Sequence, residues 1–235
     1  MSEEPGLAGT YAAEYARVRT RVHDVVNAAT PADLDAVSPA TPAWRTRDVL
    51  AHLVGVADDA INGRIDGVAT DPWTAAQVAA REQSSPAEML EEWDRIGPAF
   101  EAVIAGLPDV IAGQVLFDAF THERDIRHAV AAPGGFESDV LDLVFRWVTD
   151  SRLFTELPTL RFDTEAGVAV SGAGEPVATV GASRFEIVRA STGRRSASEV
   201  EKYAWDPVMD VSVVLVAPFF RLRDDPLNEE CAAPR

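Results

Sequence analysis

Apolar residues recur at helical spacing through the first two thirds of the chain. From residue 11 to 28 they fall every three or four positions, and the same period returns at 46–62, 85–106, 108–130 and from 138 onward. A shorter helix is expected at 73–81. Long helices joined by short or moderate connections are typical of an antiparallel bundle. The pattern therefore predicts a four-helix bundle in this part of the chain.

Capping signals mark several of the helix ends. Ser85 can cap the third long helix, because Pro86 suits the first helical position and Glu88 completes a capping box. Thr46 is the expected N-cap of the second helix. The stretch Pro133-Gly134-Gly135 should end the fourth. These signals divide the helical region into separate elements.

The pattern changes near Leu157, where short alternating segments separated by glycines and acidic turns replace the long helices. The predicted elements are strands at 159–163, 167–171, 176–180 and 208–218, and short helices at 184–190 and after Ser196. The predicted fold class is α+β. An N-terminal antiparallel four-helix bundle (residues 8–156) is followed by a smaller C-terminal α/β domain (157–235).

Composition limits the classes of function. The 235 residues are 47% hydrophobic and carry a net charge of −17, which disfavours nucleic acid and anionic membranes as partners. The single cysteine, Cys231, rules out an internal disulfide and a cysteine-rich metal cluster. The N-terminus lacks signal-peptide features, and no apolar run approaches the ~20 residues that span a bilayer. We expect a soluble cytoplasmic protein, monomeric or homodimeric.

Candidate chemistry centres on two of the four histidines. Asp118 and His122 are four residues apart on a predicted helix, so their side chains share one face and can bind a divalent ion together. His52, in the middle of another helix, is the candidate third ligand, and three protein ligands leave a position open for catalysis. The alternative interpretation is a solvated Asp–His pair and an ordinary partly buried histidine.

Three segments resemble one family. Residues 42–53, PAWRTRDVLAHL, resemble the W-s-v-r-D-v-l-a-H-L signature of the mycothiol-dependent maleylpyruvate isomerase family, in the DinB-like helical-bundle superfamily. Residues 117–127, FDAFTHERDIR, are similar to its second signature, in which a Glu precedes the metal-binding His by four positions. Residues 184–196, RFEIVRASTGRRS, resemble its E-l-l-R-a-l-t-G-R-R-S element. The three occur in the family's order, and the resemblance as a whole extends from about residue 10 to 215.

The resemblance implies a metal, usually zinc, held at the positions of His52, Asp118 and His122. It also implies that a low-molecular-weight thiol, mycothiol, binds near the metal as cosubstrate. Two features depart from the family pattern. Asp118 stands where many members have Glu, and the family's functional arginine between the second and third helices has no clear match in Arg64 or Arg81.

Several further residues are candidates for supporting roles. Asp48 lies four residues before His52 and Asp125 three after His122, so either carboxylate can orient a ligand imidazole, with capping or solvated charge as the alternative. Glu123 and Arg124 are expected to face solvent. Four arginines form a local basic group that is interpreted either as internal salt bridges or as a contact for an anionic ligand: Arg184, Arg189, Arg194 and Arg195.

The leading functional hypothesis is a metal- and mycothiol-dependent enzyme. A metal-bound thiol loses its proton and becomes nucleophilic, so it can add to an electrophilic substrate. The outcome is either isomerisation, as in a maleylpyruvate isomerase-like enzyme, or conjugation, as in an S-transferase. The alternatives are a non-catalytic metal-binding or regulatory module, and a metal-dependent hydrolase in which water takes the open position.

Overall fold

The computed structural model describes residues 6–136, 138–151, 157–217 and 220–229. Contacts between Cα atoms divide the chain into two compact units, residues 1–135 and 136–235. This division falls before the boundary expected near Leu157, because the helix at 138–151 packs against elements of the second unit. The unit boundary thus follows packing rather than the change in sequence pattern.

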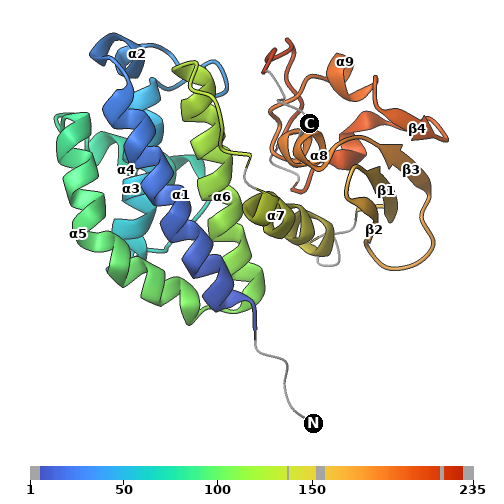
Figure 1. Ribbon diagram of the computed structural model, residues 1–235, viewed down its shortest axis with the longest axis horizontal. Helices are drawn as coiled ribbons and strands as arrows, with labels where there is room; N and C mark the ends of the chain where they lie inside the picture. Colours follow the sequence, from blue (N-terminus) through green and yellow to red (C-terminus); the bar gives the residue numbers. More distant parts are fainter. Residues whose placement is uncertain (1–5, 137, 152–156, 218–219, 230–235) are drawn as a thin grey trace. The chain divides into compact units, whose positions relative to one another are not determined.

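In the described part of the first unit, residues 6–135, the named elements are all helices (Figure 1). They lie close to the positions that the apolar periodicity predicts. They are α1 (Ala8–Ala28), α2 (Pro31–Asp35), α3 (Thr46–Ile61), α4 (Asp71–Ala80), α5 (Pro86–Ala105) and α6 (Asp109–Ala129). Helix α1 packs against α5 and α6, and α3 packs against the same two helices. Helix α4 packs against α3. The four long helices therefore enclose a shared interior.

Much of that interior is apolar. Trp93 of α5 lies fully inside it, and its Nε1 donates a hydrogen bond of 3.0 Å to the hydroxyl of Tyr15 on α1. The Tyr15 ring also meets Phe100 edge-on at 5.1 Å between centroids. Each large apolar side chain buried in this way contributes about 1.5–3 kcal/mol. The core thus fixes the spacing of the helices.

Local signals explain where these helices begin. Ser85 Oγ accepts from the Glu88 amide at 3.2 Å and Glu88 accepts from the Ser85 amide at 2.7 Å, so the predicted capping box is confirmed. The expectation that Thr46 caps α3 is wrong. Arg45 occupies the N-cap position, and the Thr46 hydroxyl instead donates to the Ala36 carbonyl. Helix α2 was not anticipated, although Thr30 caps it through a similar box.

The second unit combines helices with a small sheet. Its elements are α7 (Ser138–Ser151), β1 (Leu160–Thr164), β2 (Gly167–Ser171), β3 (Ala178–Gly181), α8 (Arg184–Ser191), α9 (Ala197–Val200), β4 (Ala204–Asp206) and the 3₁₀ helix η2 (Val211–Val214). The strand order is β2-β1-β3-β4, with β1 parallel to β3 and the outer pairs antiparallel. Helix α7 packs against α8 and β2. The predicted α+β class is confirmed.

The expected strand at 208–218 is wrong. Residues 211–214 form a 3₁₀ helix instead, which begins where Asp210 accepts a hydrogen bond of 2.9 Å from the Ser212 amide. The fourth strand is the short segment 204–206. An apolar β-branched run predicts burial as well as it predicts a strand, and here only burial of Val214 and Val216 is realised. Pro218 lies outside the described residues.

Two arginines of the predicted basic group, Arg189 and Arg195, form internal ion pairs. Arg189 and Arg195 are almost fully buried, and both contact the Glu229 carboxylate, at 2.8 and 3.1 Å. Arg195 also pairs with Glu186 through two bonds of 2.7 Å. These contacts favour the salt-bridge interpretation of this basic group.

Among the described residues, no helix is long and apolar enough to cross a membrane.

Candidate metal centre

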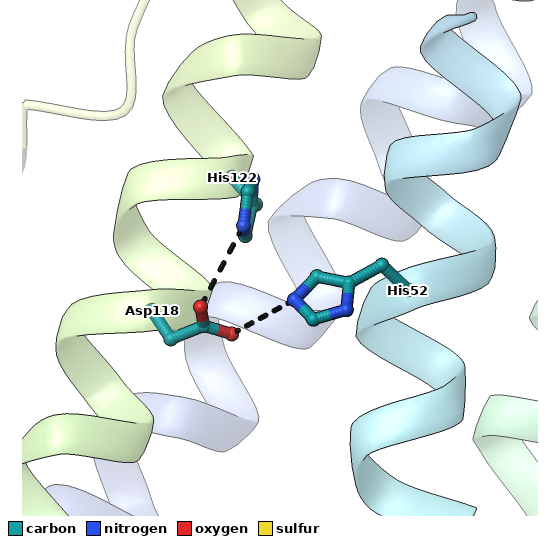
Figure 2. A group of neighbouring side chains, drawn as sticks. All are labelled: His52, Asp118 and His122. Carbon is teal, nitrogen blue, oxygen red and sulfur yellow. Dashed lines mark ion pairs between the residues drawn. The ribbon is translucent and has the colours of Figure 1, made fainter. Parts of the chain in front are cut away.

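Helices α3 and α6 bring the three predicted ligands together. His52 extends from the middle of α3, and Asp118 and His122 extend from successive turns of α6 (Figure 2). The two Asp118 oxygens face different imidazoles, with Oδ2 3.6 Å from Nε2 of His52 and Oδ1 3.6 Å from Nε2 of His122. One ligand atom from each residue lies within 4.8 Å of the other two. This spacing suits three ligands around one ion.

Burial differs among the three side chains. The imidazoles of His52 and His122 are 6% and 9% exposed, whereas the Asp118 side chain is 38% exposed. The cluster is therefore closed on the histidine side and open beside the carboxylate. Burial lowers the pKa of His122, against the opposing effect of the nearby Asp118 carboxylate. A neutral imidazole is the form that binds a metal, so the environment favours the ligand state.

Asp125 lies where it can orient His122. Its buried carboxylate is 3.1 Å from Nδ1 of that imidazole, one turn further along α6. A carboxylate can only accept, so Nδ1 carries the hydrogen and Nε2 turns its lone pair toward Asp118. A carboxylate behind a ligand histidine is a frequent arrangement in metal sites.

Asp48 is engaged elsewhere. Its carboxylate accepts from the Arg45 backbone amide at 2.9 Å and from the Arg45 guanidinium at 2.8 and 3.0 Å, which closes the first turn of α3. The group at Nδ1 of His52 is Gln77 of α4, whose Oε1 lies 2.8 Å away. Gln77 cannot be identified from the sequence, because no motif marks it and its contact with His52 depends on how α4 packs against α3.

Two tryptophans flank the imidazoles. The Trp44 ring lies 5.5 Å from the His52 ring and 6.3 Å from the His122 ring, measured between centroids. Trp73 meets His52 edge-on at 6.4 Å, and its Nε1 donates a 3.0 Å hydrogen bond to the Arg64 carbonyl. We expect these rings to limit the motion of the imidazoles and the access of water to them.

Glu123 and Arg124, next to His122, are buried, so the expectation that they face solvent is wrong. Glu123 accepts from Arg21 of α1 at 2.6 and 2.8 Å and from Arg127 of α6 at 2.9 Å. Arg124 donates to the Gly134 carbonyl. Helix α6 is covered on several sides, so its charged residues pair inside the protein. The Glu123 contacts tie the ligand-bearing helix to α1.

The two arginines between the second and third long helices are also paired. Arg81 is buried and contacts Glu92 at 2.6 Å and Asp58 at 3.2 Å. Arg64 contacts Asp58 and Asp59. These ion pairs join the end of α3 to the connection that follows it, to the end of α4 and to α5. Asp59 also accepts a hydrogen bond from Nε2 of Gln77, the residue that contacts His52.

The fold and the cluster together define a helical domain with a candidate metal centre. Residues 15–131 match the family model described as the mycothiol maleylpyruvate isomerase N-terminal domain. Through this domain the chain belongs to that family, as the sequence motifs predict. The match includes His52, Asp118 and His122.

Solved structures show a similar fold. The crystal structure of the mycothiol-dependent maleylpyruvate isomerase aligns with a TM-score of 0.56 and 13% identity, over 86% of this chain and 95% of that one. A histidine-to-alanine mutant under the same name aligns with a TM-score of 0.52 and 12% identity, with the same coverage. At such identity the likeness concerns the fold. No curated protein matches the sequence significantly.

Proposed function

We propose that this protein is a metal- and mycothiol-dependent enzyme that activates the thiol for attack on an electrophilic substrate. The observation that carries the proposal is the convergence of His52, Asp118 and His122, with ligand atoms within 4.8 Å of one another. Membership of the mycothiol maleylpyruvate isomerase N-terminal domain family supports mycothiol as cosubstrate. The four long helices are proposed to form the antiparallel DinB-like bundle.

The donor set fits zinc. Two imidazole nitrogens and one carboxylate oxygen are common zinc ligands, and three protein ligands leave a position for an exogenous group. Once bound, the divalent ion would supply the positive charge that stabilises a thiolate at neutral pH, where a free thiol with a pKa near ~8.5 is mostly protonated. His52 and His122 provide neutral nitrogens for it, and Asp118 provides a negative charge at the exposed edge.

Two reaction outcomes follow from thiol activation. In the first, the sulfur adds to an activated cis double bond, the carbon–carbon bond rotates, and elimination returns the thiol and the trans alkene. In the second, the addition is not reversed and a thioether remains. The family description and the name of the similar solved enzyme favour isomerisation, so an isomerase of the maleylpyruvate isomerase kind is our first proposal and an S-transferase the second.

The experiment that tests the proposal measures bound metal in the purified protein. We expect about one zinc per chain, and a large loss of zinc in His122→Ala. His128→Ala is the matched control, because it removes an imidazole from the same helix outside the cluster. Undiminished zinc in His122→Ala would remove the metal site from the proposal.

Activity assays then separate the classes of function. Turnover of maleylpyruvate, or conjugation of a generic electrophile, should require both the thiol and the metal. Hydrolysis without added thiol would favour a metal-dependent hydrolase, and metal binding without turnover would favour a regulatory module.

Light scattering would decide between the proposed monomer and homodimer. A cytoplasmic location is part of the proposal, because the cosubstrate must remain a reduced thiol.

A further inference from the structure

The side chain of Gln77 connects His52 to a charged network on α3 and α4. Its Oε1 lies 2.8 Å from Nδ1 of His52, and its Nε2 donates to Oδ2 of Asp59 at 2.8 Å. Gln77 is buried, with 3% of its surface exposed. Asp59 also accepts from Nε of Arg64 at 2.8 Å. The amide is therefore held at both ends.

This arrangement determines which ring nitrogen of His52 carries the hydrogen. The Asp59 carboxylate only accepts hydrogen bonds, so the NH₂ group of Gln77 must face Asp59 and its carbonyl oxygen must face His52. A carbonyl oxygen also only accepts, so Nδ1 of His52 must donate. In a neutral imidazole the lone pair then belongs to Nε2, the atom 3.6 Å from Asp118.

We propose that Gln77 is a positioning residue, which holds His52 in the tautomer that presents Nε2 as a metal ligand. This inference rests on the proposed metal-dependent function. Gln77 acts on His52 as Asp125 acts on His122, so each histidine has its own acceptor at Nδ1. One acceptor is a charged carboxylate from the same helix, and the other is a neutral amide from α4.

A glycine in α3 provides the space for this contact. A Cβ built on Gly55 would lie 2.5 Å from Cβ and 2.7 Å from Cγ of Gln77. Gly55 is three residues after His52 and thus on a neighbouring part of the same helix face. Glycine inside a helix costs about 0.5–1 kcal/mol relative to alanine. Here it lets the Gln77 side chain lie directly against α3, within reach of His52.

The test compares four forms of the full-length protein with the native chain. Gln77→Met removes the acceptor at nearly constant volume. In the double variant Gln77→Glu with Asp59→Asn, one carboxylate oxygen at position 77 accepts from Nδ1 of His52, and the other accepts from the amide group at position 59. Gly55→Ala displaces Gln77 without changing a polar group. Gln83→Met is the matched control, because Gln83 is exposed just beyond the end of α4.

The first measurement is the zinc dissociation constant, obtained by chelator competition. Loss of a partner behind a ligand histidine typically weakens metal binding by about 10–100-fold. We expect a weakening in that range for Gln77→Met, a smaller one for Gly55→Ala, recovery in the double variant and no change in Gln83→Met. Native affinity in a folded Gln77→Met protein would overturn the inference. So would weak binding in the double variant.

The second measurement needs no metal and tests the inference separately. Proton–nitrogen correlation spectra of the metal-free native protein, above the ordinary imidazole pKa of about 6.5, report which nitrogen is protonated. The His52 signal is assigned from a His52→Gln variant. We expect the hydrogen on Nδ1, and a mixture in Gln77→Met. A hydrogen on Nε2 of the native protein overturns the role of Gln77, even if the Met variant fails to fold. Absence of zinc from a native protein with the expected tautomer counts against the proposed function alone.

Discussion

Replacing Glu123 by glutamine should destabilise the first unit strongly. Glu123 has no exposed side-chain surface and accepts three hydrogen bonds, two from Arg21 and one from Arg127. The replacement keeps the shape of the side chain but removes its charge. It also places an NH₂ group against a guanidinium, and both groups are donors. Two largely buried guanidinium groups, of Arg21 and Arg127, then lose the negative charge that Glu123 supplies to them.

The expected cost follows from these contacts. Hydrogen bonds to a charged group contribute roughly 1.5–3 kcal/mol each, and removing one partner of a buried ion pair costs about 3–5 kcal/mol. One acceptor oxygen remains in Glu123→Gln, so we expect a loss of about 3–5 kcal/mol rather than the sum of all three bonds. For a chain of this size that corresponds to a fall in melting temperature of roughly 6–20 °C.

Urea unfolding followed by circular dichroism would measure this loss. Asp94→Asn is the matched control, because Asp94 pairs with Arg19 at 2.8 Å but is 52% exposed. Exposed pairs contribute below about 1 kcal/mol. If Glu123→Gln costs no more than Asp94→Asn, the burial argument is wrong, and the Glu123 pairs do not hold α6 to α1.

Three further predictions concern other parts of the chain. Burial lowers the pKa of His122, against the effect of Asp118, so the folded-state pKa lies below the unfolded value of about 6.5. As the pH falls, the unfolded chain takes up the His122 proton first, and this favours unfolding. The stability that the neutral His122 gives the metal-free protein is therefore intact above about pH 6.5 and is lost as the pH falls toward the folded-state pKa. Urea unfolding from about pH 8 to pH 5 should show this loss in the native protein, and equal pH dependence in His122→Gln would contradict it. Ser85→Ala removes the hydroxyl that caps α5 and should cost about 0.5–2 kcal/mol with zinc affinity unchanged; a loss near zero would show that the cap is replaced by water. Gly193→Ala should cost about 1–3 kcal/mol, because residue 193 has φ +70° and its added Cβ would meet the Arg221 carbonyl oxygen; thermal unfolding equal to native would refute the strain.

Much of the helical part could be predicted from the sequence. The helices at 46–62 and 85–106 were predicted nearly to the residue, because an apolar period and clear end signals coincide there. The run at 208–218 had no such periodicity, and its β-branched composition did not determine its conformation. The helix at 138–151 was predicted, but which unit it joins depends on contacts with α8 that leave no local pattern.

Some residues of the candidate site could likewise be predicted from the sequence, and others could not. His52, Asp118 and His122 could be selected from spacing and motif, and Asp125 from its position one turn beyond His122. Gln77 could not, because its contact with His52 depends on how α4 packs against α3, and the local sequence does not determine that packing. The burial of Glu123 was missed for a similar reason, since a charged residue in a helix indicates solvent unless its partners are known.

The unequal exposure of the three candidate ligands has a consequence for how ions and thiols exchange at the site. Asp118 borders solvent while both imidazoles are covered, so we expect exchange of ions and thiols to occur past its carboxylate. A bulky thiol would then insert its sulfur end while the rest of the molecule stays outside the helices. A chelator should reach the proposed ion by the same route, so we expect the occupancy of the centre to follow the free metal concentration around the protein.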